Sequence, residues 1–260
     1  MDFFRLGVLG APIEHSRSPE LHRALLELAG FQGVYRRVRV SDEFGLLEEL
    51  GRLRAGDRDG LNITMPLKTL AARLADSVSP LAARAGSVNT LMRSGSEIHG
   101  ESTDCAVFKE LLSTDHFDRR TSILVLGTGG SAAAALAAVE GKEPIYVAGR
   151  RRDRAEELTA RLGGEVISWG TAVAGALVIN STPLGMKGED LPSGLVGVAA
   201  GLIDLPYGDA ATPATHSARR MGIGLVDGDE FLLRQAVASF RLWTGHHIDY
   251  RELANRLKKV

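Results

Sequence analysis

The chain has 260 residues, of which 44% are hydrophobic and 24% charged, and 31 Lys and Arg against 32 Asp and Glu give a formal net charge of −1. This composition is typical of a globular protein and excludes disorder. The balanced charge argues against nucleic-acid binding, which needs a basic excess. No run of about 18 uncharged apolar residues is present, so we expect no membrane span. The first residues also lack the basic region and long apolar run of a secretory signal.

Cysteine usage indicates a reducing compartment. The single cysteine, Cys105, rules out an intrachain disulfide framework. We therefore expect a cytoplasmic protein. Without a supporting motif, Cys105 is more often a structural residue than a nucleophile.

Short apolar runs alternate with amphipathic segments along the chain, which is typical of an α/β architecture. Ser18 and Pro19 are interpreted as the N-cap and first residue of a helix. In chain order, the first 100 residues are predicted to hold a strand at 4–9, a helix at 18–28, a strand at 33–40, a helix at 43–53, a strand at 61–64, a helix from 66, and a hairpin of 87–92 with 97–100.

A polar, charged segment at 115–120 separates the two halves of the chain. Beyond it, the continuous apolar run at 122–126 is expected to be a central parallel strand buried on both faces. Asp153 is interpreted as the N-cap of its helix. The elements predicted after the central strand are a helix at 131–139, a strand at 144–148, a helix at 153–162, strands at 177–180, 201–204 and 223–226, and helices at 231–242 and 250–259.

This alternation predicts βαβ units with right-handed crossovers. We predict two domains, the second inserted into the first. Residues 1–106 with 231–260 would form an N-terminal α/β substrate-binding and catalytic domain completed by C-terminal helices. Residues 107–230 would form a Rossmann-like dinucleotide-binding domain.

The glycine-rich segment after the central strand is the first candidate binding site. Residues 127–132 fit the pattern G-x-G-x-x-A between a buried strand and a helix. Gly127 would permit the tight turn, Gly129 would let the backbone approach a pyrophosphate, and Ala132 would let the helix pack closely. The helix N-terminus would offer unpaired N–H groups to the phosphates. A tight turn without a ligand is the alternative.

An arginine-rich segment, 149–154, follows the second strand of the same unit. An acidic residue at this point would favour NAD, because it accepts hydrogen bonds from the ribose diol. Arg150, Arg151 and Arg154 could instead hold a 2′-phosphate. We therefore predict NADP as the cofactor, although arginine runs often simply face water.

Four polar clusters, 15–19, 62–68, 87–90 and 102–104, occur where the strands of the first half are predicted to end. Ligands of open α/β sheets bind outside the carboxyl ends of strands, so these clusters could converge on one crevice. Ser16 and Ser18, near a helix N-terminus, are suited to a carboxylate. Asn62, Thr64 and Asn89 could supply neutral donors and acceptors to ring hydroxyls.

Lys68 and Asp104 are the candidates for acid–base chemistry. Reduction of a ketone by hydride transfer needs a proton donor at the developing alkoxide, and oxidation needs a base. A carboxylate paired with a lysine would keep the ammonium group charged and oriented. Taken singly, each side chain is more often a solvated surface residue, and spacing in the sequence does not bring the two together.

Several long segments together resemble the shikimate dehydrogenase (shikimate/quinate dehydrogenase) family over nearly the whole chain. The segments that carry this resemblance are GVLGAPIEHSRSPELH, GLNITMPLK, GSVNT, GESTD, GTGGSA, GRRRDR, NSTPLGM, DLPY and DGDEFLLRQAVASFRLWTG. The resemblance implies a reversible, NADP-linked reduction of 3-dehydroshikimate to shikimate in the synthesis of aromatic amino-acid precursors. It implies no metal, and monomers and homodimers both occur in the family.

The resemblance also implies roles for single residues. Lys68 would be the acid–base group, with Asp104 as its partner. Ser16 and Ser18 would hold the substrate carboxylate. The ring would be bound by Thr64, Asn89, Asp104, Tyr207 and Gln235. The pyrophosphate loop would be Gly127, Thr128, Gly129, Gly130 and Ser131. Arg150 and Arg154 match the phosphate clamp, to which Arg151 adds a cation. Leu205 and Gly228 match positions whose backbone lies near the nicotinamide.

Some positions depart from the family pattern, and they keep two alternatives open. Gly149 and Arg151 stand where the clamp commonly has Asn and Thr, and Phe231 stands where a methionine is usual. The first alternative is a paralogue acting on quinate or an amino-substituted analogue, with NAD as a candidate cofactor. The second is a dinucleotide sensor without chemistry, which would have no reason to keep Lys68 and Asp104 in their motifs.

Overall fold

The computed structural model describes residues 3–141, 143–208 and 210–258, so the predicted helix end at 259 lies outside the described residues. The chain divides into two compact units, one of Met1–Ala106 with Leu233–Val260 and one of Val107–Leu232. Two helices, α5 (Thr103–Leu112) and α9 (Gly228–Thr244), have residues in both units. No helix within the described ranges is long and apolar enough to cross a membrane.

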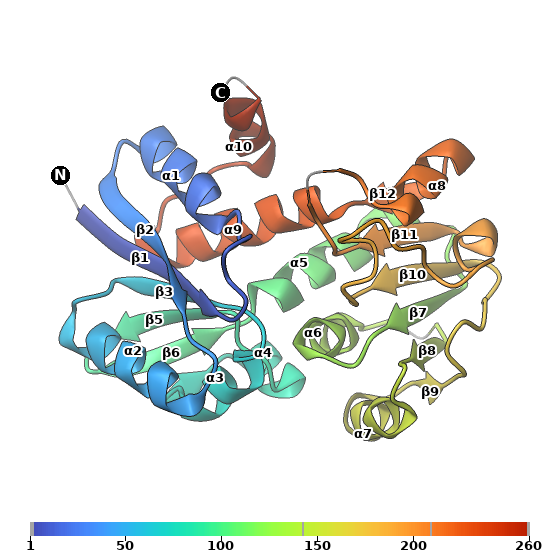
Figure 1. Cartoon of the computed structure of the whole chain (residues 1–260), viewed down its shortest axis with the longest axis horizontal. Helices are drawn as coiled ribbons and strands as arrows, with labels where there is room; N and C mark the ends of the chain where they lie inside the picture. Colours follow the sequence, from blue (N-terminus) through green and yellow to red (C-terminus); the bar gives the residue numbers. More distant parts are fainter. Residues whose placement is uncertain (1–2, 142, 209, 259–260) are drawn as a thin grey trace. The chain divides into compact units, whose positions relative to one another are not determined.

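The first unit is built on a six-stranded mixed sheet with the strand order β2-β1-β3-β5-β6-β4 (Figure 1). β1 pairs in parallel with β2 and β3, whereas β5 runs antiparallel to β3 and β6. The carboxyl ends of β1, β3 and β6 and the amino end of β5 therefore lie at one edge of the sheet. The strands are β1 (Phe3–Gly10), β2 (Gln32–Arg39), β3 (Gly60–Ile63), β4 (Ser77–Val78), β5 (Thr90–Ser94) and β6 (Glu97–Glu101).

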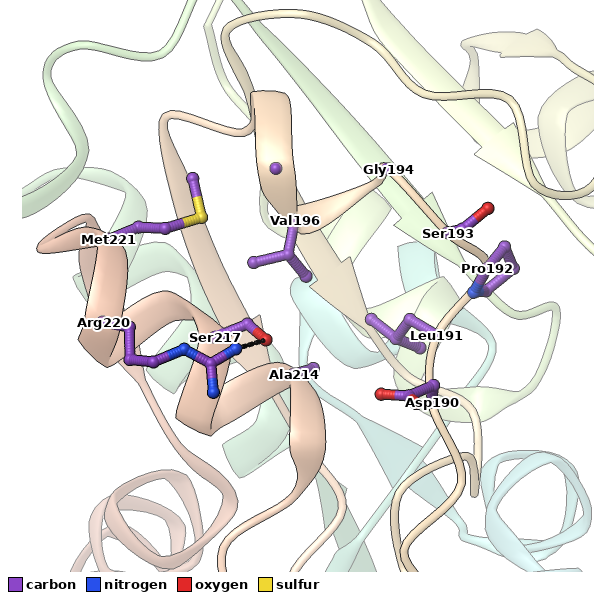
Figure 2. A pocket seen from close by; sticks show the side chains of 11 residues that line it. Asp190, Leu191, Pro192, Ser193, Gly194, Val196, Ala214, Ser217, Arg220 and Met221 are labelled. Atoms are coloured by element: carbon purple, nitrogen blue, oxygen red, sulfur yellow. Dashed lines mark hydrogen bonds between the residues drawn. The ribbon is translucent and has the colours of Figure 1, made fainter.

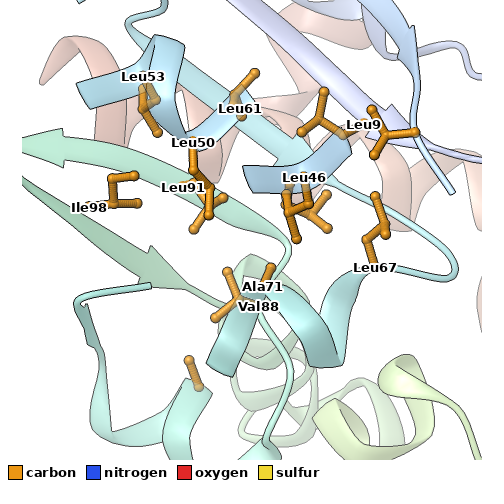
Figure 3. Packing of buried hydrophobic residues seen from close by; sticks show 13 residues of the cluster. Leu9, Leu46, Leu50, Leu53, Leu61, Leu67, Ala71, Val88, Leu91 and Ile98 are labelled. Carbon is orange, nitrogen blue, oxygen red and sulfur yellow. The ribbon is translucent and has the colours of Figure 1, made fainter. Parts of the chain in front are cut away.

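Helices cover both faces of this sheet (Figure 1). One face carries α2 (Glu43–Ala55), α3 (Lys68–Leu74) and α4 (Pro80–Ala85). The other carries α1 (Ser18–Ala29) and the later part of α9, and α10 (Tyr250–Leu257) packs on α1. Leu46, Leu50 and Leu53 recur at helical spacing on α2 and are fully buried against Leu61 and Leu91 of the sheet (Figure 3). Burial of such a leucine stabilises the fold by roughly 1.5–3 kcal/mol, so this apolar face fixes α2 on the sheet.

The second unit contains a six-stranded parallel sheet with the order β12-β11-β10-β7-β8-β9. The chain begins at β7 in the middle, adds β8 and β9 on one side, and then adds β10, β11 and β12 on the other. This order has its switch point between β7 and β10, where ligands of doubly wound sheets bind. The strands are β7 (Ser122–Leu126), β8 (Ile145–Ala148), β9 (Glu165–Val166), β10 (Ala176–Asn180), β11 (Gly201–Asp204) and β12 (Gly224–Val226).

The helices of the second unit follow its strands. α6 (Gly130–Ala138) contains six buried alanines, and these small side chains let the helix lie close to the sheet. α7 (Arg152–Leu162) follows β8, and α8 (Pro213–Met221) packs on β11 and β12. Leu124, Val178 and Leu202 of three neighbouring strands form one core cluster with Ala214 and Ala218 of α8.

Most predicted elements are confirmed, including β7 and the hairpin of β5 and β6. Two predicted N-caps are wrong. α1 begins at Ser18 with Arg17 as its N-cap, because the Ser18 hydroxyl faces Ser16 and not the helix backbone. α7 has Arg151 as its N-cap, and Asp153 lies in the first turn, where its carboxylate pairs with the Arg151 guanidinium. Helices α4, α5 and α8 were not predicted.

Candidate active site

The two predicted acid–base residues meet at the shared edge of the first sheet. Lys68 opens α3 directly after β3, and Asp104 lies in the first turn of α5 directly after β6. The Lys68 Nζ donates to the Asp104 Oδ2 at 2.5 Å, across 36 positions of sequence. The two side chains are only 18% and 7% exposed, so solvent screens this ion pair less than a surface pair. An ammonium held in place by a carboxylate can donate or recover one proton.

Asn89, which precedes β5 at the same edge, holds the carboxylate from its other side. Its Nδ2 donates to Asp104 Oδ1 at 2.8 Å and to the Thr103 hydroxyl at 2.9 Å. Its Oδ1 accepts from the Thr103 backbone N–H at 2.7 Å. Both N–H groups of this buried amide are therefore engaged within the protein. Asn89 must exchange one of these bonds to donate to a ligand.

Asn62 of β3, which pairs with Thr90 of β5, is engaged in the same way. Its Nδ2 donates to the Asn89 carbonyl oxygen at 3.2 Å and to the Thr90 hydroxyl at 3.1 Å. Its Oδ1 accepts from the Tyr35 hydroxyl at 2.7 Å. The side chain of Asn62 thus links β2 to β5. To bind a ring hydroxyl, as predicted, Asn62 would have to give up one of these hydrogen bonds.

The two predicted carboxylate-binding serines lie on the loop that leads from β1 into α1. Both side chains are buried, and the Ser16 hydroxyl donates to the Ser18 hydroxyl at 3.2 Å. Arg37 of β2 fixes this loop, because its Nε and Nη2 donate to the Ser16 carbonyl oxygen at 2.9 and 2.5 Å. Sequence reasoning missed Arg37. Its alternation with Tyr35 on one strand is the signal that could have found it.

The remaining predicted substrate residues divide between the units. Thr64 follows β3 and is half-buried, and Gln235 is buried on α9, both in the first unit. Tyr207 is half-buried and belongs to the second unit. The structure therefore brings Lys68, Asp104 and Asn89 into direct contact, and places the other residues by unit.

Cys105 is a structural residue, as expected. The side chain is fully buried beside Asp104. Burial, opposed by the Ser102 hydroxyl and aided by the Asp104 charge, raises the pKa of the thiol to about 11. A thiol with so high a pKa holds little thiolate near neutral pH, so it is a poor nucleophile.

His22 lies behind this network in the core of the first unit. Neither ring nitrogen has a hydrogen-bond partner among the described residues, and the ring stacks on Tyr35 at 4.3 Å with an interplanar angle of 3°. Burial lowers the pKa of His22 from 6.5 to about 3, which the nearby Asn62 side chain offsets only in part. The imidazole is therefore neutral at working pH.

This buried histidine is expected to make the fold sensitive to mild acid. Between pH 6.5 and about 3 the unfolded chain binds a proton that the folded chain does not. Stability should fall by about 1.4 kcal/mol per pH unit in this window, or roughly 2 kcal/mol at pH 5. Urea unfolding of wild type and of His22→Phe at pH 7, 6 and 5 measures this, with the exposed His216→Phe as control. Equal pH slopes for wild type and His22→Phe would contradict the assignment.

The glycine turn of the second unit lies between β7 and α6. Gly127 has φ +115°, a left-handed conformation that favours glycine, and a Cβ there would lie 2.5 Å from the Ser181 hydroxyl. Gly129 is the N-cap of α6, and a Cβ there would meet no protein atom within 4 Å. Packing within the protein therefore does not require this glycine. The open space beside the first N–H groups of α6 suits a pyrophosphate.

Gly149, a departure from the family pattern, has a physical reason. A Cβ at this position would lie 2.7 Å from the Cγ2 methyl of Thr128 in the glycine turn. The methyl group occupies the space that an asparagine side chain would need. Thr128 and Gly149 are therefore complementary, and the arginines that follow must supply any contact to the adenosine end.

Those arginines differ in their surroundings. Arg151 pairs with Asp153 at 2.6 Å, and Arg154 pairs with Glu157 at 2.8 Å, so each already has an acidic partner. Arg150 is exposed and has no ion pair among the described residues. Of the three predicted clamp residues, Arg150 is thus the best placed to take a new anion.

Leu205 and Gly228, predicted to lie near a nicotinamide, are neighbours in the second unit. A Cβ on Gly228 would lie 2.7 Å from the Leu205 carbonyl oxygen. Beside them, the Asp204 carboxylate is fully buried at the end of β11. It accepts from Asn180 Nδ2 at 2.7 Å, from Thr215 at 3.1 Å and from the Thr212 hydroxyl. Burial raises its pKa, although these three donors oppose the shift. This network ties the segments after β10 and β11 together.

A cavity of about 340 Å³ lies elsewhere in the second unit, between the 190–197 segment and α8 (Figure 2). Leu191, Val196 and Met221 give it an apolar lining, and Arg220 donates to Ser217 at its side. None of the predicted site residues lines it. This cavity is therefore separate from the candidate site.

Comparison of the sequence and the structure with known proteins identifies the family of the chain. Residues 8–91 match the family model described as the shikimate dehydrogenase substrate binding domain. A shikimate dehydrogenase (NADP(+)) of Anaeromyxobacter sp. (strain Fw109-5) is 37% identical over 92% of this chain and 90% of that protein. One of Paramagnetospirillum magneticum is 38% identical over 92% of each. The crystal structure of shikimate 5-dehydrogenase from Thermus thermophilus in complex with NADP(H) and shikimate has a TM-score of 0.87 at 30% identity, covering 98% of this chain and 99% of that one.

The strand order of the second unit and its glycine turn are those of a Rossmann-like unit, and the first unit carries a lysine–carboxylate pair. These features define an oxidoreductase of the dinucleotide-dependent class. The chain belongs to the shikimate dehydrogenase family. The fold class and the family predicted from the motifs are both confirmed.

Proposed function

We propose that this protein catalyses the NADP-dependent, reversible reduction of 3-dehydroshikimate to shikimate, a step that supplies aromatic amino-acid and chorismate synthesis. The observation that carries this proposal is the buried contact of Lys68 with Asp104 in a chain of this family. A chain that had kept only dinucleotide binding would have no need of this costly pair. The sensor alternative therefore has no support.

Lys68 is proposed to be the general acid in the reduction and the general base in the reverse reaction. Bound NADPH supplies the hydride to the carbonyl carbon of the substrate. As the carbonyl oxygen gains negative charge, the Lys68 ammonium donates a proton to it, so the product is a neutral hydroxyl group. In the reverse direction the neutral amine takes the hydroxyl proton. Asp104 keeps the ammonium in one orientation in both directions, because Asn89 fixes the carboxylate.

The other substrate contacts are proposed from the family motifs. Ser16 and Ser18 would bind the substrate carboxylate, which suits hydroxyls and N–H groups at the start of α1. Arg37 supports this role by fixing the Ser16 carbonyl and adding positive charge behind the loop. The ring would be bound by Thr64, Asn89, Asp104, Tyr207 and Gln235.

The coenzyme site is proposed in the second unit. Its pyrophosphate would lie on the turn made by Gly127, Thr128, Gly129, Gly130 and Ser131, for which the open space at Gly129 is the support. Arg150 would bind the 2′-phosphate, with Arg151 and Arg154 adding charge nearby. The backbone of Leu205 and Gly228 would lie beside the nicotinamide.

A steady-state assay of hydride transfer tests the reaction and the substrate together. Purified protein is offered shikimate and quinate, each with NADP and with NAD, and the four kcat/KM values are compared. The proposal expects shikimate with NADP to give the highest value. A higher value with quinate would favour the paralogue, and no turnover with any pair would overturn the proposal.

Arg150 is expected to set the preference for NADP. Its guanidinium has no ion pair among the described residues, so Arg150→Ala should raise the KM for NADP about tenfold to a hundredfold, the worth of a charge-assisted contact. The KM for NAD should change little. Arg152→Ala is the matched control, because Arg152 is already paired with Glu156. Equal losses with both cofactors would contradict a role at the 2′-phosphate.

We also propose that the protein is cytoplasmic and acts as a monomer or homodimer. The fully buried, single Cys105 supports a reducing compartment. Cell fractionation and sedimentation equilibrium measure the two properties.

A further inference from the structure

The catalytic pair is the end of a chain of hydrogen bonds that begins on β2. The Tyr35 hydroxyl donates to Asn62 Oδ1 at 2.7 Å, and Asn62 Nδ2 donates to the Asn89 carbonyl oxygen and to the Thr90 hydroxyl. Asn89 Nδ2 donates to Asp104, which holds Lys68. Each member except Tyr35 and Lys68 is at least nine-tenths buried, so water does not readily replace these bonds.

The Tyr35 hydroxyl helps to set which way the Asn62 amide faces. The two ends of an amide have nearly the same shape, so only hydrogen-bond partners distinguish them. With the oxygen turned to Tyr35, both N–H groups face the Asn89 carbonyl and Thr90. The reverse orientation would set the Asn62 oxygen against the Asn89 carbonyl oxygen, two acceptors without a proton between them. The Asn89 carbonyl oxygen and the Tyr35 hydroxyl, which would lose Asn62 Oδ1 as its acceptor, both disfavour that arrangement.

Asn62 in turn braces Asn89. It holds the Asn89 main chain through the carbonyl, and Thr90 bridges the two side chains by donating to Asn89 Oδ1 at 3.3 Å. The Asn89 side-chain amide donates one N–H to Thr103 and the other to Asp104. A shift of Asn89 would therefore move the carboxylate that aligns the Lys68 ammonium.

Tyr35 is itself held by aromatic packing. Its ring lies parallel to the buried His22 ring at 4.3 Å, and Trp243 of α9 lies 6.4 Å away. Trp243 is anchored by donating its indole N–H to the Leu91 carbonyl oxygen at 3.0 Å. Because His22 stays neutral at working pH, this packing does not change its charge over the range in which the enzyme would be assayed.

We propose that Tyr35 is a positioning residue for the reaction: its hydroxyl fixes the Asn62 amide and, through Asn89, the direction in which Asp104 holds the Lys68 ammonium. This inference rests on the proposed function. Tyr35 acts on the catalytic pair through Asn62, to which its hydroxyl donates, and is not itself a catalytic residue.

A double-mutant cycle tests this pathway. Tyr35→Phe keeps the ring on His22 and removes only the hydroxyl. We expect kcat with shikimate and NADP to fall about tenfold, more than the shikimate KM rises, because alignment of the proton donor is lost while only the ring contacts of Asn89 and Asp104 are disturbed. Asn62→Ala should lower kcat at least as much. The double variant should be no slower than Asn62→Ala alone, since the hydroxyl then has nothing to orient.

Tyr146→Phe is the matched control, because this half-buried tyrosine packs against the core of the second unit. It should keep the wild-type kcat. Multiplicative losses in the double variant, or a wild-type kcat in Tyr35→Phe, would overturn the inference while leaving the proposed function intact. A wild type without shikimate turnover would instead overturn the proposed function.

A second measurement does not depend on turnover. Hydrogen exchange of the side-chain amides of Asn62 and Asn89, followed by NMR, should be slow in wild type and in Tyr146→Phe because both amides are buried and bonded. Tyr35→Phe should speed exchange of both at least tenfold. Unchanged protection of Asn89 in Tyr35→Phe would overturn the relay even if the enzyme proved to act on another substrate.

Discussion

Lys68→Ala is expected to lower kcat by about 10²–10⁴ while the shikimate KM changes less than about threefold. Proton donation by a positioned group contributes rate enhancement of this size, and it acts in the transition state and not in binding. The Lys68 ammonium, which lies 2.5 Å from Asp104, is the group that we propose for this step. Removing it leaves the alkoxide to take its proton from water.

Single-turnover kinetics and steady-state assays of this variant separate the chemical step from binding. Lys109→Ala is a suitable control, since Lys109 forms an exposed ion pair with Glu140 in the second unit. Turnover of Lys68→Ala within a few-fold of wild type would show that another group moves the proton.

Asp204→Ala is expected to cost about 3–5 kcal/mol in the free energy of unfolding. It would leave Asn180, Thr212 and Thr215 with buried donors that have lost their acceptor, and each such donor carries a desolvation penalty. Urea unfolding at pH 7 followed by circular dichroism measures the loss.

Asp204→Asn is the control variant, and its free energy of unfolding should not fall as that of Asp204→Ala does. Burial raises the pKa of Asp204, so the charged form is disfavoured in the folded chain, and the stability contributed by this group is lost as pH rises through its folded pKa. An asparagine can still accept from Asn180 and can donate to the two hydroxyls. We expect Asp204→Asn to be at least as stable as wild type at pH 7. A loss equal to that of alanine would mean that the negative charge itself is required.

How far the sequence predicts this fold depends on how local the signal is. The strand at Ser122–Leu126 is found because five consecutive apolar residues reflect burial on both faces. Helix α8 was missed although Thr212 and Pro213 stand at its N-cap and first turn, a signal that is available in the sequence. The error at Ser18 is of another kind, since only the folded loop shows that its hydroxyl faces Ser16.

The site divides in the same way. The motif residues Lys68, Asn89 and Asp104 can be singled out from the sequence, but their contact cannot, because it depends on β5 lying antiparallel between β3 and β6. The engagement of Asn62 and Asn89 within the protein is equally invisible in sequence. Each looks like an available amide until its partners are known.

The discontinuous first unit has a consequence for synthesis of the chain. The opening 106 residues lack the later part of α9, in which Trp243 packs on Gly60 of β3 and bonds to Leu91, and Phe240 packs against His22 and Phe31. During translation, at roughly 5–20 residues per second, the second unit is complete before that helix emerges. The first 106 residues are thus made first but covered last. Their exposed apolar face is the surface on which a nascent-chain chaperone would act. A polypeptide that ended at residue 232 would contain a complete second unit attached to an incomplete first unit.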